Sequence, residues 1–424
     1  MAKWEITRKT FLLTGLLTLV SEFPALAVLV PSLKFSRAID ASTLQFLITS
    51  PLVGTGYLEY GTKPGTYGIR TPALALKKGV VITSNVSGLT SGTKYYFRLR
   101  YLTSGKTYLS TSVVSVTTPT SQASAIFAIQ ADPHMDENSS ADVYNKTLDL
   151  VVASGATFLM DLGDIFMVDK LADKSEANIR ARYVLMKSFY DRLKGLPLRI
   201  VLGNHDGELG YSTFNTKKYR AEYFPEQTHE VSYFSYVESN VLHIALDPFT
   251  YTTSNPKADG WQWTLGKVQY DWLVKTLQAS KEKHKFVYLH HLLVGDAQSR
   301  GGTKIASYNE WGGKNMDGTE GFNQMRPGWG KPIHQLLKEN NVSIVFKGHD
   351  HLYVKEEMDG IIYQTVPQPS HAGDGTNSAV EYGYGAGKVV GGSGFLKVTA
   401  SESKAQVDFV KYDGTIADSY SITS

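Results

Sequence analysis

The stretch FKGHDHLYV, residues 346–354, places His349 and His351 one residue apart, directly after an apolar run. In an extended strand, side chains i and i+2 point to the same face, so this spacing predicts two imidazoles aimed at one point. Imidazole is the commonest metal ligand among protein side chains. Two histidines are also compatible with a solvated or core pair, so a metal site requires partners elsewhere in the chain.

The histidine pair follows the apolar run SIVF (343–346). Four more apolar runs have the pattern of strands, and each is also followed by a polar cluster. The four runs are AIFAIQ (125–130), TFLMDL (157–162), LRIVL (198–202) and KFVYL (285–289). Their clusters supply Asp132 and His134, then Asp164, then Asn204 to Asp206, and finally His290 and His291. Ligands gather outside the carboxyl ends of strands in open α/β sheets, so we expect one crevice to collect all five clusters. Each cluster alone has a structural explanation, such as a helix cap or a turn, but five in one order favour a metal site.

The number of donors predicts two ions rather than one. Three oxygen donors and four imidazoles exceed what a tetrahedral centre uses, whereas two ions roughly 3.5–4 Å apart can share a carboxylate. The chain contains no cysteine, which excludes disulfides, thiolate ligands and a cysteine nucleophile. The predicted metal ligands are Asp132, His134, Asp164, Asn204, His290, His349 and His351.

The length of 424 residues predicts two or three domains. Short β-rich runs between Gly, Ser, Pro and Asn clusters predict a β-sandwich over residues 33–118. From residue 125 to 420, strand runs alternate with stretches of helical apolar spacing, which predicts an α/β domain. The expected helices are 142–153, 175–193, 264–279 and 331–340, and a hairpin is expected over 232–246.

The N-terminus has the pattern of an export signal. Lys3, Arg8 and Lys9 precede the apolar run 11–20, and ALA at 25–27 offers a cleavage site, so residues 1–27 are expected to be removed on the way to the periplasm or the outside. TRKTFLL also resembles a twin-arginine signal with a lysine in place of the second arginine. The run is too short to span a bilayer, and the net charge of +3 gives no sign of nucleic-acid binding.

The order D-x-H, GD, GNHD, H and GHxH, as carried by these clusters, resembles the calcineurin-like metallophosphoesterases. With the sandwich in front, the chain looks like the purple acid phosphatase branch, and LTSGTKY (89–95) resembles the tyrosine corner of fibronectin type III domains. The resemblance implies an all-β, fibronectin III-like sandwich followed by a four-layer domain of β-sheets flanked by helices.

The resemblance also implies how the ions are held and what they do. Asp132, His134, Asp164 and His351 would hold one ion, and Asp164, Asn204, His290 and His349 the other, with Asp164 bridging. A metal-bridging hydroxide would then attack a small phosphate ester. His205, oriented by Asp206, would stabilise or protonate the leaving oxygen.

Two positions depart from the purple acid phosphatase pattern. His134 stands where that branch has glycine, and Met167 stands where it has a tyrosine ligand, so no purple colour is expected. Iron with zinc or manganese, two manganese ions or two zinc ions all suit mixed imidazole and carboxylate donors.

Substrate choice is expected to lie in the Gly-rich loop 295–330. Arg300, Lys304 and Arg326 either contact phosphate or pack the loop down. His291 faces either substrate or the core, and His371 is a weaker candidate contact. Aromatic residues of the loop either stack on a leaving group or pack the loop down; these are Tyr308, Trp311 and Trp329. A phosphodiesterase, a metal-binding relative without turnover and an adhesion module remain alternatives to a phosphomonoesterase, and the oligomeric state stays open.

Overall fold

The structure is a computed structural model of the chain. It describes residues 30–423 except 41, 104–106, 120–123, 136–138, 207–217, 225–231, 239, 250–259, 295–299, 374 and 386. The predicted export signal, 1–27, therefore lies outside the described residues. The chain divides into two compact units, one built mainly from Phe46–Ser84 and Tyr96–Ser115 and the other mainly from Val116–Ser424. The predicted domain boundaries, 33–118 and 125–420, stay predictions.

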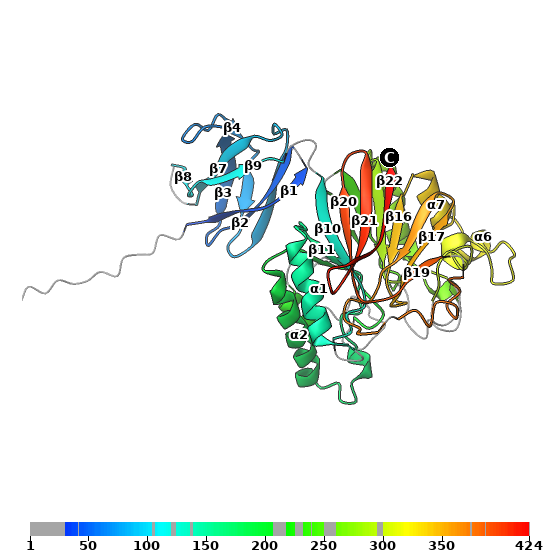
Figure 1. The fold of residues 1–424 in the computed structure, drawn as a ribbon. Helices are drawn as coiled ribbons and strands as arrows, with labels where there is room; N and C mark the ends of the chain where they lie inside the picture. The colour runs from blue at the N-terminus through cyan, green and yellow to red at the C-terminus, as the bar shows by residue number, and fades with distance from the viewer. Residues whose placement is uncertain are drawn as a thin grey trace, which may run out of the picture. The chain divides into compact units, whose positions relative to one another are not determined.

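The N-terminal part is a β-sandwich of two small antiparallel sheets (Figure 1). The first has the order β1 (Ser32–Asp40), β2 (Thr43–Thr49), β6 (Val81–Val86). The second contains β3 (Gly54–Gly61), β4 (Ile69–Arg70), β5 (Leu74–Leu76), β7 (Lys94–Leu102), β8 (Leu109–Ser110) and β9 (Val114–Thr117).

Alternating burial along the strands explains why the two sheets pack. In β7 every second side chain is buried, as expected for a strand with one face on a core. The rings of Phe46 and Phe97 meet with centroids 4.4 Å apart across the two sheets. The predicted tyrosine corner is confirmed, because the Thr90 backbone N–H donates to the Tyr95 hydroxyl at 2.9 Å.

The larger unit contains two mixed β-sheets. One has the order β12 (Leu198–Ile200), β11 (Leu159–Asp161), β10 (Ala125–Gln130), β20 (Gly394–Ala400), β21 (Lys404–Lys411), β22 (Ile416–Thr423). The other has the order β13 (Phe234–Glu238), β14 (Val241–Ala245), β15 (His284–Leu289), β16 (Ile344–Lys347), β18 (Ile361–Thr365), β17 (Tyr353–Met358), β19 (Lys388–Val390). Strands β10 to β12 run parallel, as do β14, β15, β16 and β18.

Helices cover the outer faces of both sheets. The longer ones are α1 (Ala141–Ala153), α2 (Glu176–Tyr190), α4 (Gly266–Ala279) and α7 (Ile333–Glu339). Short helices are α3 (Lys218–Tyr223), α5 (Asn309–Gly312) and α6 (Phe322–Met325), with 3₁₀ turns at Val168–Lys170, Asp191–Leu193 and Gly260–Gln262. No helix among the described residues is both long and apolar enough to cross a membrane.

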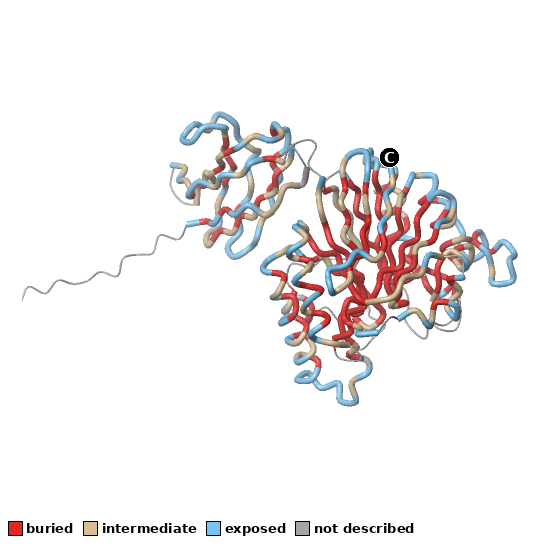
Figure 2. The backbone as a smooth tube through the Cα atoms, in the orientation of Figure 1, coloured by how far each residue is buried: buried red, intermediate tan, exposed pale blue. Residues whose placement is uncertain are grey.

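Three apolar cores hold the four layers together, and Figure 2 shows buried backbone concentrated along the central strands. The core between the sheets joins Phe127 of β10 to Phe286 of β15, and Tyr353 of β17 stacks on Phe409 of β21 with centroids 4.8 Å apart. Helices α1 and α2 pack on the β10 to β12 side, and α4 and α7 on the β14 to β16 side. The predicted four-layer α/β fold is confirmed.

The five clusters come together at the ends of strands from two sheets, because β10, β11 and β12 belong to one sheet and β15 and β16 to the other. One local expectation was wrong, namely an extended His-x-His. Strand β16 ends at Lys347, and His349 and His351 have φ angles of 72° and 58°, which are left-handed rather than extended.

Candidate metal centre

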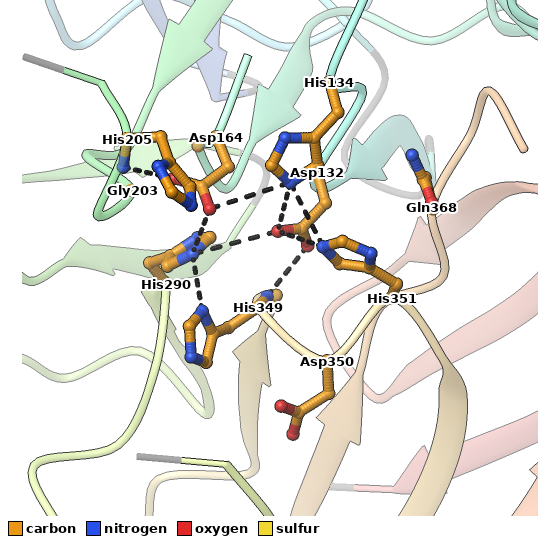
Figure 3. Close-up of polar contacts among 12 residues, drawn as sticks. Asp132, His134, Asp164, Gly203, His205, His290, His349, Asp350, His351 and Gln368 are labelled. Atoms are coloured by element: carbon orange, nitrogen blue, oxygen red, sulfur yellow. Dashed lines mark hydrogen bonds and ion pairs between the residues drawn. The ribbon is translucent and has the colours of Figure 1, made fainter. Parts of the chain in front are cut away.

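Five loops at the ends of five strands bring the predicted ligands together (Figure 3). Asp132 and His134 follow β10, Asp164 follows β11, Asn204 follows β12, His290 follows β15, and His349 and His351 follow β16. The two sheets each contribute to the same polar cluster, so the centre lies at one end of the sheet pair.

The loops bend sharply at the ligand positions. Asp132, His134, Asp164, His349 and His351 all have positive φ angles, between 42° and 72°. A left-handed backbone costs a non-glycine residue roughly 1–2 kcal/mol. Such strain persists where the surrounding structure imposes it, and it concentrates at functional sites.

Glycines let two of these loops touch. A Cβ atom on Gly203 would lie 2.2 Å from Asp164 Oδ1, and one on Gly163 would lie 2.3 Å from the Gly203 backbone nitrogen. Real Cβ atoms do not approach other atoms so closely, so the side chain of alanine would push Asp164 out of place. The glycines before Asp164 and Asn204 are therefore required by the close approach of the β11 and β12 loops.

Six of the predicted ligands form two compact groups, each able to hold a cation. Asp132, His134 and His351 form the first group; Asp164, His290 and His349 form the second. In the first, the Nε2 atoms of His134 and His351 are 3.1 Å apart, and Asp132 Oδ1 lies 3.7 Å and 3.5 Å from them.

The second group is arranged around His290 Nε2. This atom lies 3.1 Å from Asn204 Oδ1, 3.1 Å from Asp164 Oδ2 and 3.2 Å from His349 Nδ1. Donor atoms bound at about 2.1 Å to one cation are about 3.0–3.4 Å apart when they subtend roughly 90–109°. The spacing of these four donors therefore fits one shared ion, and it places the seventh predicted ligand, Asn204, beside the second group.

Two carboxylates connect the groups. Asp164 Oδ2 lies 3.7 Å from His134 Nε2 of the first group and 3.1 Å from His290 Nε2 of the second. Asp132 Oδ1 is buried with no hydrogen-bond partner among the described residues, yet three imidazole nitrogens face it at 3.5–3.8 Å. A buried carboxylate oxygen without a donor is costly unless a cation neutralises it. The residues present therefore fit a dinuclear metal centre.

The electrostatics of the bare site lead to the same conclusion. Burial by itself disfavours the imidazolium of His290, but the Asp164 and Asp132 carboxylates outweigh burial and raise its pKa to about 9. Burial would also raise the pKa of Asp164, but His290 and His205 hold it below the usual range. Burial, with His290 next in importance, lowers the pKa of His349. The carboxylates thus require positive charge, which protons or metal ions can supply.

Backbone groups orient the donors from behind. His290 Nδ1 lies 2.9 Å from the Leu162 carbonyl oxygen, which can only accept, so the proton of the neutral ring sits on Nδ1 and Nε2 presents its lone pair to the centre. The His349 backbone N–H donates to Asp132 Oδ2 at 2.8 Å. The His205 backbone N–H donates to Asp164 Oδ1 at 2.8 Å. Each carboxylate therefore has one oxygen fixed by an amide and one turned toward the imidazoles.

Asp206 connects the loops that carry the ligands. Its carboxylate accepts backbone N–H bonds from Gly203 at 2.6 Å, Asp164 at 2.7 Å and Ile165 at 2.9 Å. The side chain is buried, and it ties the β11 loop to the β12 loop. Asp206 thus positions the ligand loops, and the predicted orientation of His205 by Asp206 stays a prediction.

His205 lies beside the first group. It is half-buried, and its ring centroid is 5.8 Å from that of His134 (Figure 3). This position suits the predicted contact with substrate, and that role stays a prediction.

The three candidate substrate contacts are in different surroundings. His291 is buried against Phe249 and Trp263, with ring centroids 5.0 Å and 4.4 Å away, and burial lowers its pKa to about 3. Arg300 donates to the His349 carbonyl oxygen at 2.6 Å, which places it next to the centre. Arg326 forms an ion pair with Glu310 of its own loop.

The described part of the loop, residues 300–330, is packed rather than open. Arg326 pairs with the buried carboxylate of Glu310 at 2.5 Å and donates to the Trp261 carbonyl oxygen. Trp311 is fully buried and donates to the Tyr363 hydroxyl at 2.8 Å. Arg326 and Trp311 therefore hold the loop in place, which is the second of the two alternatives; residues 295–299 lie outside the described residues.

Sequence reasoning missed a charged group directly behind the GHDH loop. Asp350 points away from the imidazoles (Figure 3) and pairs with Lys347 at 2.7 Å, and both side chains are fully buried. The Tyr384 hydroxyl donates to the same carboxylate oxygen. Lys347 and Asp350 lie on either side of His349 in sequence, directly after an apolar strand. Two opposite charges at the end of a buried strand were the signal that could have predicted this ion pair.

Comparisons with known proteins agree with this geometry. The family model of calcineurin-like phosphoesterases matches residues 126–353, more than half of the chain. The chain belongs to this family. A search of the curated proteins found no match. The predicted metallophosphoesterase is therefore confirmed at the level of the family.

Solved structures extend the similarity to the whole fold. Purple acid phosphatase PPD1 from yellow lupin (Lupinus luteus) seeds is 14% identical, with a TM-score of 0.51 over 93% of this chain and 74% of that one. PhoD is 12% identical, with a TM-score of 0.51 over 92% of this chain and 88% of that one. Both similarities concern the fold, and they include the sandwich in front of the phosphoesterase unit.

Proposed function

We propose that the protein hydrolyses small phosphate esters at a dinuclear metal centre. The observation that carries this proposal is the pair of His/Asp groups side by side, with Asp164 Oδ2 between His134 and His290. When bound, two cations supply positive charge to the phosphate oxygens and acidify water, so hydrolysis requires no protein nucleophile. Iron with zinc or manganese, two manganese ions and two zinc ions are the proposed metals.

The chain's own residues hold the cations and handle the leaving group. The imidazoles and carboxylates fix the ions in one geometry, because backbone amides orient them from behind. His205 is proposed to donate a proton to the leaving oxygen, since it is half-buried and lies next to His134.

A substitution of His205 tests this role cleanly. The contact with Asp164 comes from the His205 backbone, so His205→Ala keeps it and should retain both metal ions. We expect turnover to fall about 10²- to 10⁴-fold, the range of general acid catalysis. Because p-nitrophenolate leaves more readily than phenolate, the loss should be larger for phenyl phosphate. Equal losses on both esters, with metal retained, would remove His205 from proton transfer.

The type of ester is decided by a paired assay. The metal-loaded enzyme is offered p-nitrophenyl phosphate and bis-p-nitrophenyl phosphate, and we propose the monoester as the better substrate with the diester as the alternative. A chelated sample serves as the control. Hydrolysis of neither ester by the loaded protein would leave a metal-binding relative without turnover.

Export is proposed as well. Its support is the pattern of basic residues, an apolar run and ALA within residues 1–27. Fractionation of cells that produce the full chain tests it, with N-terminal sequencing of the mature protein. Protein that starts at Met1 and remains in the cytoplasm would contradict the proposal.

A further inference from the structure

A polar cavity of about 290 Å³ lies next to the metal centre. His351 belongs to both, since it is in the first ligand group and also lines the cavity. The rest of the lining includes Arg300, Gln368, His371, Tyr382 and Ser393. A substrate whose phosphate sits on the centre can therefore extend into this cavity.

The described lining offers several hydrogen-bond donors and the guanidinium of Arg300. Asp350 is the only carboxylate among the described lining residues, and its oxygens already accept several bonds. One oxygen accepts from Lys347 Nζ at 2.7 Å and from the Gly301 backbone N–H at 3.0 Å, as well as from Tyr384. The other accepts from Arg300 at 3.2 Å. The negative charge of Asp350 is thus neutralised by Lys347 and Arg300.

Arg300 is held at the cavity wall in a fixed orientation. Its Nη1 donates to the His349 carbonyl oxygen and to Asp350, and the guanidinium lies over the Tyr382 ring, 4.7 Å from the centroid. A planar guanidinium whose orientation is fixed beforehand loses little entropy when it binds a carboxylate or a phosphate. The pair Lys347 and Arg300 also places two cations beside one carboxylate.

We propose that this cavity is a subsite for an oxyanion on the leaving group of the substrate, with Arg300 as its anchor and Asp350 as the residue that positions Arg300. The substrate is then a phosphate ester whose alcohol carries a carboxylate or a second phosphate. This inference rests on the proposed phosphoesterase function.

Matched pairs of substrates test the subsite. 3-Phosphoglycerate and glycerol 3-phosphate differ at a carboxylate, and propane-1,3-diol bisphosphate and 3-hydroxypropyl phosphate differ at a second phosphate. The readout is the ratio of kcat/KM within each pair, from phosphate release, because a general loss of activity cancels in the ratio. We expect a ratio of roughly 10 to 100 in favour of the oxyanion, the value of a charge-assisted hydrogen bond. The pair with the larger ratio identifies the oxyanion.

Variants assign the preference to Arg300. Arg300→Gln should bring the ratio to about 1, Arg300→Lys should keep part of it, and Asp350→Asn should lower it by releasing Arg300. Arg192→Gln is the control, since Arg192 is a partly exposed arginine that pairs with Asp149, outside the described lining of the cavity, and should keep the wild-type ratio. Metal content is measured in each variant.

Several results would overturn the proposal. An active wild type with a ratio near 1 in both pairs excludes the subsite, and an unchanged ratio in Arg300→Gln excludes its anchor. If no ester is hydrolysed, the proposed function fails, and calorimetric affinities for the same ligand pairs then decide the subsite on their own. Equal affinities within both pairs would contradict it.

Discussion

Metal binding at the second group should release a proton from His290. In the metal-free protein, Asp164 and Asp132 outweigh burial and raise the pKa of His290 to about 9, so the ring carries a proton at neutral pH. The ring must lose that proton to bind a metal through Nε2. Below pH 9, each decrease of one pH unit should therefore weaken the apparent metal affinity about tenfold, which amounts to about 100-fold from pH 8 to pH 6. His349, whose pKa burial lowers, should contribute no proton.

Titration calorimetry with Mn²⁺ measures this linkage. At pH 7, heats in two buffers of different ionisation enthalpy give the number of protons released at the second site, and we expect about one. The variant His290→Asn should release none from this position, and His371→Gln, outside both ligand groups, should behave as wild type. An affinity that stays constant between pH 6 and pH 8, or no proton release in the wild type, would show that His290 carries no proton in the metal-free protein.

Three further substitutions have defined outcomes. Gly203→Ala places a Cβ 2.2 Å from Asp164 Oδ1 and should destabilise the fold by about 1–3 kcal/mol and reduce metal content, whereas Gly385→Ala, with open space around it, should change neither. Trp311→Phe removes a buried hydrogen bond and should cost about 1–3 kcal/mol in urea unfolding without altering kcat/KM, so a selective loss of activity would return Trp311 to the substrate site. Asp206→Asn puts an amide NH₂ opposite a backbone N–H, so thermal melts should show lower stability and elemental analysis less metal; unchanged metal content would argue against its role in positioning the loops.

The metal centre was predictable because its signal is local. Asp132, Asp164 and His290 each come within a few residues after an apolar strand, and this pattern is visible in the sequence. The structure brings these residues together in the predicted groups. Strand ends and donor types were therefore sufficient to find the residues that the structure brings together in the two groups.

The arrangement of strands was less predictable. The sequences of β10 and β15 do not indicate that the two strands belong to different sheets, because both strands are mainly apolar and buried on two faces. The turn at His349 was also hidden, since left-handed backbone at a histidine is unfavourable locally and is imposed by tertiary contacts.

The roles of charged and aromatic loop residues depended on distant partners. Arg326 and Arg300 look alike in sequence, but Arg326 meets the buried Glu310 and Arg300 meets Asp350. Asp206 accepts from amides of Asp164 and Ile165, which lie about 40 residues earlier in the chain. Such pairings arise from the fold, and a single sequence gives no distance between them.

Hydrolysis should require two metal ions held by the seven donors. The most direct measurement removes all metal with a chelator, returns it in steps, and records bound metal per chain by elemental analysis beside the rate of p-nitrophenyl phosphate hydrolysis. We expect no activity in the stripped protein, saturation at two ions per chain and full activity only at that stoichiometry. Full activity after stripping, or saturation at a single ion, would contradict it.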